Sequence, residues 1–386
     1  MPLSGTRVCV VVPVRNEAEN IWDTLDALRL QTDNKGHKID PNLYEVLVLV
    51  NNCTDASFAI TKEFQYKYPK FRLHIDQIQL PDPLANIGTV RSLLMDEAYR
   101  RFMLISNEEG IIASTDGDTI ADQNWLYYIM SEIDKGNDAV GGRILALQQS
   151  DTARLYHLRD VTYRCLLAQA ESLIDPQLHD PMPRHFQYFG ASLAVTCKMY
   201  QLVGRLPQVP NLEDMAFHQA LIRHDAKIRK SFNVKVYTSS RIQGRVDIGF
   251  SEQLRQWTLD SAANKTQQVE SVEIQLRKFK LRKRLRKCWL EFQNRGLPQQ
   301  ELIDLASLLK FKIEWLHTQF TTAPYFGILW EAVEKALHQA HWQQSQRPQP
   351  IMKAIHELRT FIHDHQATVF QIDPDDNFLF VYKANA

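Results

Sequence analysis

Two carboxylates one residue apart are the strongest candidate for chemistry in this 386-residue chain. The segment Ser114-Thr115-Asp116-Gly117-Asp118-Thr119 follows directly on the apolar run Ile111–Ala113. Because both side chains sit on one tight turn, they can point at a single divalent cation, and Mg²⁺ or Mn²⁺ prefers such oxygen ligands. A cation held there would neutralise the charge of a departing diphosphate. The alternative is a simple turn capped by aspartate side chains, since Asp and Gly dominate turns.

A second polar cluster, Asn51-Asn52-Cys53-Thr54-Asp55, follows the apolar run Tyr44–Val50. A helical stretch begins directly after it, and the N-terminus of a helix attracts anionic groups. The cluster could therefore hold a nucleotide base or a phosphate. Its alternative is a capped loop, with Thr54 or Asp55 as the N-cap.

A third cluster, Asn211-Leu212-Glu213-Asp214, opens another helical stretch. A carboxylate in a pocket can remove the proton from an attacking hydroxyl group, which would make Asp214 or Glu213 catalytic. Adjacent acids at a helix start can also do no more than compensate the helix dipole.

The elements that must position these clusters alternate between two signatures in residues 7–140. Apolar, β-branched runs predict strands, and the stretches between them predict helices, the first of which we expect to start at Asn16-Glu17-Ala18-Glu19. This alternation predicts a doubly wound, mostly parallel sheet, in which ligands bind beyond the carboxyl ends of the strands. The expected strands are Arg7–Val14, Tyr44–Val50, Phe71–Ile78 and Ile111–Thr115, and the expected helices are 56–68 and 86–102.

The rest of the chain changes character near residue 250. Residues 141–250 are mixed, with a helix expected at Asp151–Ile174 and a strand at Lys235–Ser240. Beyond Ser251 long helical periodicity appears, so we expect an α/β domain at 1–250 and a mainly α-helical domain at 251–386. The stretch 344–349 is an expected linker, and 377–383 an expected strand-like tail.

The three clusters, led by Val11-Val12-Pro13-Val14-Arg15-Asn16-Glu17, resemble in this order the family 2 glycosyltransferases of the GT-A fold. The resemblance covers roughly residues 7–250. It implies a Rossmann-like GT-A domain that transfers sugar from a nucleotide-diphospho-sugar donor, a UDP- or GDP-sugar, with Mg²⁺ or Mn²⁺. The acceptor is an unidentified hydroxyl group.

The resemblance also implies roles for single residues on the donor side. The opening loop is similar to one that faces the nucleotide, the 51–55 cluster looks like a base-binding turn, and 86–91 looks like a stretch that holds the nucleotide and diphosphate. A Gly-Ala-Ser segment at 190–192 resembles one that shapes the donor-sugar pocket, and basic residues after Thr238 resemble a diphosphate contact. The implied donor-binding residues are Pro13, Arg15, Asn16, Glu17, Asn51, Asn52, Asp55, Asn86, Arg91, Asp116, Gly190, Ala191, Arg241 and Arg245.

On the catalytic side, Asp116 and Asp118 correspond by resemblance to the metal and ribose acids. Asp214, with Glu213 before it, falls on the Glu-Asp pair whose Asp is the base of inverting members. His218 lies four residues after Asp214 on the same helix face, which makes it a further candidate metal ligand. His179 and His185 are candidates for metal or acceptor binding, the alternative for all three being ordinary loop or core histidines.

Two departures from the family pattern matter. The base-binding turn is one residue short and has Asn51-Asn52 where many members have an Asp for uracil, so the base stays open. The Gln-x-x-Arg-Trp motif of processive members is absent, which favours transfer of a single sugar. Gln253-Leu254-Arg255-Gln256-Trp257 bears a passing likeness to it, but we interpret Trp257 as a packing residue.

Composition limits the partners. Lys plus Arg and Asp plus Glu are 45 each, so the net charge is zero and the chain lacks the basic field of a nucleic-acid-binding protein. Five scattered cysteines without metal spacing indicate reduced thiols and a cytoplasmic setting. No signal peptide or membrane span is expected.

The segment Arg277–Lys287 holds eight basic and no acidic residues. It predicts either a solvated helix face or a peripheral contact with an anionic membrane, in which Phe279, Leu281 and Leu285 would dip into the interface. Bulky residues farther on, Trp315, Trp330 and Trp342, are expected in a helical core rather than as sugar platforms.

The leading hypothesis is an inverting glycosyltransferase with Asp214 as its base. A retaining transferase that makes a small glycoside uses the same fold and metal acids. A nucleotidyltransferase is disfavoured, since no Gly-rich phosphate loop follows the first strand. A non-catalytic nucleotide-sugar-binding module is the remaining alternative.

Overall fold

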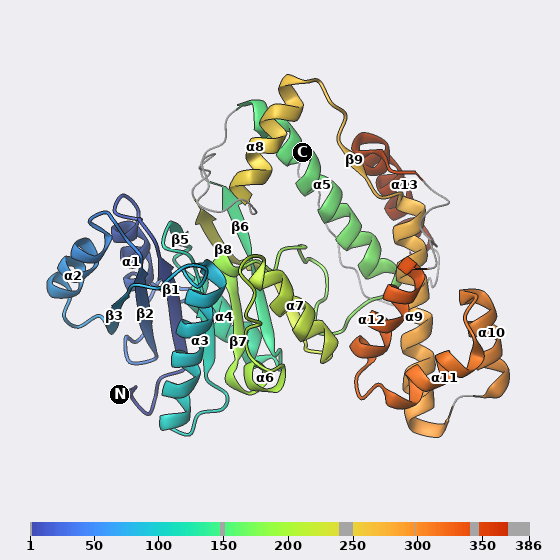
Figure 1. Cartoon of the computed structure of the whole chain (residues 1–386), viewed down its shortest axis with the longest axis horizontal. Coiled ribbons are helices and arrows are strands. Elements are labelled where there is room, and N and C mark those ends of the chain that lie inside the picture. The colour runs from blue at the N-terminus through green and yellow to red at the C-terminus, as the bar shows by residue number, and fades with distance from the viewer. Residues whose placement is uncertain (1, 147–150, 239–249, 297, 340–346, 370–386) are drawn as a thin grey trace.

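The structure is a computed structural model that describes residues 2–146, 151–238, 250–296, 298–339 and 347–369. Its N-terminal part is built on an eight-stranded sheet with the order β3-β2-β1-β4-β7-β6-β8-β5 (Figure 1). The strands are β1 (Val8–Val14), β2 (Tyr44–Asn51), β3 (Leu73–Ile78), β4 (Ile111–Ser114), β5 (Thr119–Ala121), β6 (Ala139–Ala146), β7 (Leu193–Thr196) and β8 (Ile228–Thr238).

The sheet is mixed and mostly parallel, as expected. The pairs β1–β2, β2–β3, β1–β4 and β6–β8 are parallel, whereas β4–β7, β6–β7 and β5–β8 are antiparallel. Strands β1, β2 and β4 therefore end at one edge, where the first two polar clusters follow β2 and β4. The expected α/β fold is confirmed.

Strand β1 is buried on both faces, because helices cover both sides of the sheet. Its even-numbered residues pack with α1 (Ile21–Arg29), α2 (Ser57–Lys67) and α4 (Trp125–Asp134). Its odd-numbered residues Cys9 and Val11 pack with α3 (Ile87–Leu104), α6 (Cys197–Leu202) and α7 (Glu213–Arg223). This two-sided burial explains why the strand is a continuous apolar run.

One expected helix start is wrong. Residues 15–20 form no helix, and α1 begins only at Ile21. Asn16 has a φ of 54°, a left-handed conformation that an α-helix does not contain. The acids at 17 and 19 therefore belong to a loop at the end of β1.

The C-terminal part is helical, as expected. It contains α8 (Phe250–Ala262), α9 (Val272–Arg295), α10 (Gln299–Leu309), α11 (Ile313–Thr322), α12 (Phe326–Gln339), α13 (Ile351–Val369) and the short strands β9 (Gln268–Val269) and β10 (Gln349–Pro350). Helices α9 to α12 share one core, against which Trp315 and Trp330 pack. Trp342, the stretch 344–346 of the expected linker and the 377–383 tail lie outside the described residues.

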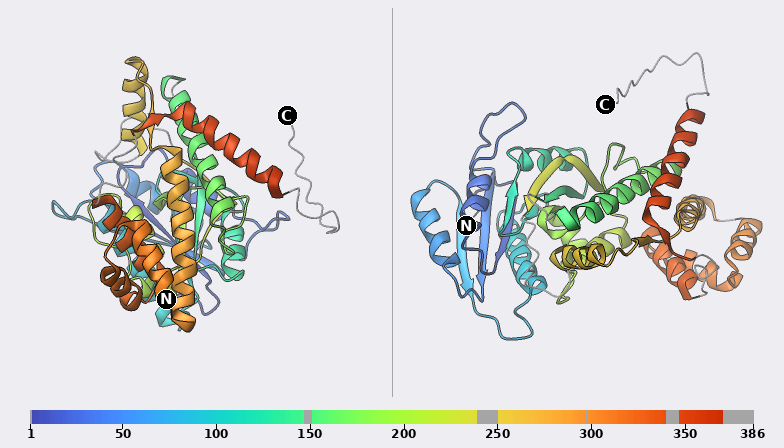
Figure 2. Two further views of the ribbon diagram at one scale, coloured as in Figure 1. Left: turned by 90° about the vertical axis from the view of Figure 1, so that its right-hand side faces the viewer. Right: turned by 90° about the horizontal axis from the view of Figure 1, so that it is seen from above.

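Helix α5 (Asp151–Ile174) joins the two parts of the molecule, although it precedes residue 250 (Figures 1 and 2). Its residues Tyr163 and Ala170 share a core with Val272 of α9 and Ile351 of α13. The 250/251 division stays a prediction, and α5 packs on helices from beyond it.

The basic segment of α9 divides between two faces. Arg282 donates to Glu171 of α5 and to Asp175 just after this helix, each at 2.7 Å, and Arg286 also pairs with Asp175. Phe279, Leu281 and Leu285 are buried, and the two leucines belong to the helical core. The expectation that they dip into a membrane is therefore wrong. Arg277, Lys280, Lys283, Arg284 and Lys287 stay exposed.

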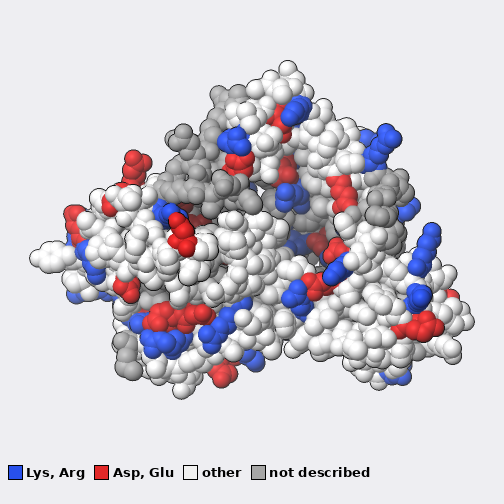
Figure 3. Space-filling model, viewed as in Figure 1, with Lys and Arg blue, Asp and Glu red and all other residues white. Residues whose placement is uncertain are grey.

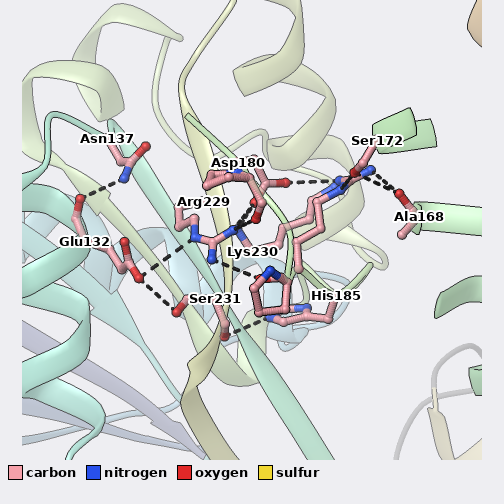
Figure 4. A network of polar contacts seen from close by, with 12 residues as sticks. Glu132, Asn137, Ala168, Ser172, Asp180, His185, Arg229, Lys230 and Ser231 are labelled. Carbon is pink, nitrogen blue, oxygen red and sulfur yellow. Dashed lines mark hydrogen bonds and ion pairs between the residues drawn. The ribbon is translucent and has the colours of Figure 1, made fainter. Parts of the chain in front are cut away.

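A polar network fastens β8 to the 175–187 loop (Figure 4). Asp180 accepts hydrogen bonds from Arg229 at 2.9 Å and from Arg184 at 3.0 Å. His185 is buried within it and contacts the Ser231 carbonyl through Nε2 at 3.1 Å. Burial lowers the pKa of His185 to about 3, so this histidine is a neutral core residue.

The two parts also meet at the far end of α7. Arg223 pairs with Glu331 of α12 at 2.7 and 2.5 Å. Asp225 caps the N-terminus of α12, accepting from the Phe326 amide at 2.6 Å and the Gly327 amide at 2.8 Å. We call these contacts the α7–α12 latch.

Charges of both signs are interspersed over the face seen in Figure 3. Within the described ranges, no helix is long and apolar enough to cross a membrane.

Candidate active site

A cavity of about 480 Å³ lies where the sheet meets α5 and α8. Six of the residues predicted from the sequence line it, although they come from four separate segments of the chain. These residues are Arg91, Asp116, Asp118, Gly190, Ala191 and Asp214.

The Asp116-Gly117-Asp118 turn lies between β4 and β5. The amide of Thr119 donates to the Asp116 carbonyl at 3.2 Å, which closes the turn. The hydroxyl of Thr24, on α1, donates to the Gly117 carbonyl at 3.0 Å and anchors it. Both carboxylates are half-buried, and both line the cavity.

These two carboxylates fit a divalent cation. Burial raises the pKa of Asp116; Arg91 opposes the increase, and Asp118 adds to it by like-charge repulsion. A cation between the two acids would relieve that repulsion, and carboxylate oxygens are the ligands that Mg²⁺ and Mn²⁺ prefer. Among the described residues, no group of three or more His, Cys, Asp or Glu side chains is arranged to hold a metal. Remaining ligands would thus come from donor phosphates and water, as is usual for Mg²⁺.

Arg91 connects the segments of the site. Its guanidinium donates to Glu213 and to Asp116, each at 2.9 Å, and to the Gly190 carbonyl at 3.0 Å. A fourth bond goes to the Ser114 hydroxyl. Four of its five N–H groups are thus used within the protein, so Arg91 organises the site more than it offers free donors to a diphosphate.

Gly190 lets Arg91 pass close to the backbone, and a side chain at this position would displace the guanidinium. A Cβ at this position would lie 2.7 Å from the Arg91 Cζ, closer than carbon atoms can pack. The Gly190 amide donates to the Asp214 Oδ2 at 3.0 Å, so the same residue also orients the predicted base.

The predicted catalytic pair divides into a buried and an accessible acid. Leu212, at the N-cap of α7, has a φ of 57°, and Glu213 and Asp214 follow in the first turn. Glu213 is buried against Arg91, whereas Asp214 is half-buried and lines the cavity. Only Asp214 is therefore placed to meet a substrate.

The predicted nucleotide loops lie next to each other at the same edge of the sheet. Asn16 Oδ1 accepts from the Thr54 amide at 2.8 Å, and Asp55 accepts from the Ala18 amide at 3.0 Å. Pro13 is buried in β1, and the buried Glu17 binds Ser57 through its amide. The two loops thus form one platform, which does not line the cavity itself.

Several asparagines and an arginine of this region have structural partners. Asn52 donates from Nδ2 to the Leu80 carbonyl at 2.8 Å and accepts at Oδ1 from the Leu80 amide at 3.0 Å. Asn86 is the N-cap of α3 and accepts from the Thr89 amide at 2.9 Å. Arg15 donates to the Ala85 carbonyl at 2.9 Å. Asn51 is buried, and its Nδ2 makes no hydrogen bond within the described part of the chain.

His218 does not line the cavity with Asp116 and Asp118, the two predicted metal ligands. It lies buried, with its ring stacked on Tyr188 at 3.7 Å and 7°. Burial, with Lys230 nearby, lowers its pKa to about 3. Arg241 and Arg245 lie outside the described residues.

Sequence reasoning missed the wall opposite the acids. Helix α5 contributes His157, Asp160 and Arg164 to the cavity, and α8 contributes Gln253 and Trp257. Nothing local marks the α5 residues as functional. A signal for α8 did exist in Gln253-Leu254-Arg255-Gln256-Trp257; Trp257 is buried, as a packing residue would be, yet it also faces the cavity.

The family model of Glycosyl transferase family 2 matches residues 9–193. This span contains the Asp116-Gly117-Asp118 turn, Arg91 and Gly190. Residues 9–193 of the α/β part therefore match glycosyl transferase family 2, and the resemblance noted in the motifs is confirmed over this span.

Glycosyltransferase AglE of Haloferax volcanii is 33% identical over 139 residues, which are 36% of this chain and 39% of that protein. The chain thus spans about two fifths of the length of this curated relative. Residues 1–349 of TarS from S. aureus, in complex with UDP-GlcNAc, are 15% identical with a TM-score of 0.44, covering 87% of this chain and 92% of that one. Mannosyltransferase PcManGT from Pyrobaculum calidifontis, in complex with GDP-Man and Mn²⁺, is 13% identical with a TM-score of 0.44, covering 96% and 89%.

Proposed function

We propose that this protein is a metal-dependent glycosyltransferase that moves one sugar from a nucleotide-diphosphate donor to an acceptor hydroxyl group, with inversion. The observation that carries the proposal is the cavity, which gathers Asp116, Asp118 and Asp214 beside Arg91. If the Asp116-Gly117-Asp118 turn did no more than cap its own backbone, there would be no reason for a candidate base, Asp214, to line the same cavity.

Asp116 and Asp118 would hold Mg²⁺ or Mn²⁺ together with the donor diphosphate. The cation supplies positive charge that stabilises the leaving nucleoside diphosphate. Arg91 keeps Asp116 in place and adds a fixed positive charge beside the turn.

Asp214 takes the proton of the acceptor hydroxyl, which then attacks the anomeric carbon of the sugar. Its Oδ2 is fixed by the Gly190 amide, and Oδ1 accepts from the Met215 amide at 2.8 Å. These bonds fix the orientation of the carboxylate that would accept the proton.

The platform of residues 13–17 and 51–55, with Asn86, is the proposed place of the nucleotide. An asparagine amide can pair with more than one base, and the Asn51 Nδ2 makes no hydrogen bond within the described part of the chain, so UDP- and GDP-sugars are both proposed donors. The five cysteines are all free, and a cytoplasmic setting stays a prediction.

Slow hydrolysis of a donor sugar tests the proposal, since it requires no acceptor. Incubation with a panel of UDP- and GDP-sugars and Mg²⁺ or Mn²⁺ should release nucleoside diphosphate from at least one of them. Nucleotide-sugar binding without release, under any metal, would favour the non-catalytic module.

Removing one metal acid should abolish metal-dependent binding of the nucleotide. In calorimetry, UDP or GDP should bind wild-type protein at least tenfold more tightly with Mn²⁺ than with chelator, and Asp118→Ala should lose this difference, because one carboxylate holds Mg²⁺ or Mn²⁺ poorly. Asp134→Ala, an exposed acid elsewhere, is the control. Equal wild-type affinity in chelator would contradict the metal site.

A peripheral membrane contact rests on the exposed cations of α9 alone. Each basic residue near an anionic surface adds about 1 kcal/mol of attraction, which salt screens. Charge reversal of Lys280, Arg284 and Lys287 should abolish co-sedimentation with phosphatidylserine vesicles, whereas reversal of Lys310 and Lys312 should not. If wild-type protein stays in the supernatant even at low salt, the exposed face of α9 is only solvated.

A further inference from the structure

The wall of the cavity formed by α5 and α8 has no role in handling the donor as proposed. It lines the same cavity as Asp116, Asp118 and Asp214, so an acceptor that reaches the proposed base also meets this wall. Its chemistry should therefore indicate what the acceptor is.

This wall carries no unpaired positive charge among its described residues. Arg164 pairs with Asp160 one turn earlier in α5, with its Nε 2.8 Å from the carboxylate. Burial lowers the pKa of His157, so its imidazole is neutral at neutral pH. Gln253 and Gln187 add amides without charge.

The opposite wall is acidic. Three carboxylates, Asp116, Asp118 and Asp214, line it with one guanidinium, that of Arg91. A cation at the two metal acids would be offset by the diphosphate of the donor. Within the described part of the chain, an acceptor that carried a phosphate near the base would meet negative charge on one side and no unpaired cation on the other.

The same wall presents aromatic rings in fixed positions. The Trp257 ring meets the His157 ring edge to face, with centroids 5.6 Å apart, and it packs on Tyr156. Tyr156 is in turn held by a hydrogen bond of 2.6 Å to the Lys265 carbonyl. The guanidinium of Arg164 lies 5.6 Å from the centre of the Phe186 ring.

Flat apolar rings beside a carboxylate–guanidinium pair match the two surfaces of a pyranose. The C–H groups of a sugar ring pack on an aromatic face, and its hydroxyl groups donate to a carboxylate and accept from a guanidinium. Rigid rings also bind at low cost in conformational entropy.

We propose that His157, Asp160, Arg164, Phe186 and Trp257 form the acceptor subsite, and that the subsite takes the ring of an uncharged saccharide. The proposal rests on the glycosyltransferase function proposed above. It names the acceptor as a neutral carbohydrate hydroxyl rather than a phosphate-bearing group.

Ligand-observed NMR with the full chain, Mg²⁺ and UDP or GDP tests the subsite directly. The neutral probes are cellotriose, maltotriose, mannotriose and chitotriose, and the anionic probes are glucose 6-phosphate and farnesyl phosphate. At least one neutral probe should bind more tightly than both anionic probes. Failure of every neutral probe to bind, or tighter binding of an anionic one, overturns the proposal.

Variants then assign the binding to this wall. Trp257→Ala should weaken binding of the neutral probe at least tenfold. Trp257→Phe should weaken it by less than about threefold, because an aromatic ring remains. The matched control is Leu259→Ala on the same helix, at a residue that is 51% exposed and should leave binding unchanged. Equal affinity of wild type and Trp257→Ala would place the sugar elsewhere.

A charge variant keeps the test decisive if Trp257→Ala does not fold. Asp160→Asn frees the Arg164 guanidinium, so the affinity for glucose 6-phosphate relative to glucose should rise at least fivefold. An unchanged ratio contradicts the assignment. Donor hydrolysis by the wild-type protein, measured on the same sample, shows separately whether the proposed transferase function holds.

Discussion

Replacing Asp214 by Asn is expected to reduce turnover at least about a hundredfold, the usual scale for loss of a general base. The amide keeps the shape of the carboxylate but cannot accept the proton of the acceptor hydroxyl. Donor affinity should stay within about threefold, because Asp214 lies outside the platform proposed for the nucleotide. Steady-state donor hydrolysis or transfer, with calorimetry for the nucleotide, measures both quantities.

The exposed Asp134→Asn serves as the control and should keep wild-type turnover. Near-normal turnover of Asp214→Asn would reduce Asp214 to a helix-start residue. The anomeric configuration of the product, read by NMR, separates the inverting mechanism from a retaining one.

Replacing Arg91 by Met should destabilise the protein by about 3–5 kcal/mol, the cost of breaking a buried ion pair on one side. The substitution would leave the buried Glu213 without its ion-pair partner, and Asp116 and the Gly190 carbonyl would each lose the hydrogen bond from Arg91. Urea unfolding monitored by circular dichroism measures the loss of unfolding free energy.

Arg100→Met provides a matched control, because Arg100 lies on the same helix but is exposed and pairs only within its own turn. Its effect should stay within about 0.5 kcal/mol. Arg91→Lys should restore part of the stability, since a single ammonium replaces the charge but not the fork of donors. Equal effects of Arg91→Met and Arg100→Met would show that Arg91 does not hold the site together.

The sequence predicts the fold best where a segment carries its own signal. Strands β1 to β4 are long or apolar enough to be found, and helix α5 has the expected bounds of Asp151–Ile174. Strands β5 and β7 contain three and four residues, too few to show a period. Strand β6 includes Gly141-Gly142, and glycine weakens the composition typical of a strand.

The residues of the candidate site could likewise be predicted only where a local sequence pattern marks them. The Asp116-Gly117-Asp118 turn and the Glu213-Asp214 pair are local patterns at the ends of predictable elements. The bonds from Arg91 to Ser114, Gly190 and Glu213 span 23 to 122 residues, so no local pattern contains them. The cavity wall from α5 was missed for the same reason, because only the packed helix brings Asp160 to the acids.

Because the α7–α12 latch holds α7 at its C-terminal end, a small tilt of this helix about the latch moves the residues at its N-terminal end. The 11 residues of α7 span about 16 Å, with Asp214 in the first turn and the latch at Arg223, its last residue, and Asp225 just after it. A Cβ at Gly327 would lie 2.0 Å from the Ile222 carbonyl oxygen, so the backbones of the two helices are in direct contact beside the latch. Tilting the helix there by about 5° would move Asp214 by more than about 1 Å, a displacement that can cost a hundredfold in rate. Surface changes around Arg223 and Glu331 can therefore tune the chemistry from a distance, without altering any group that touches the sugar.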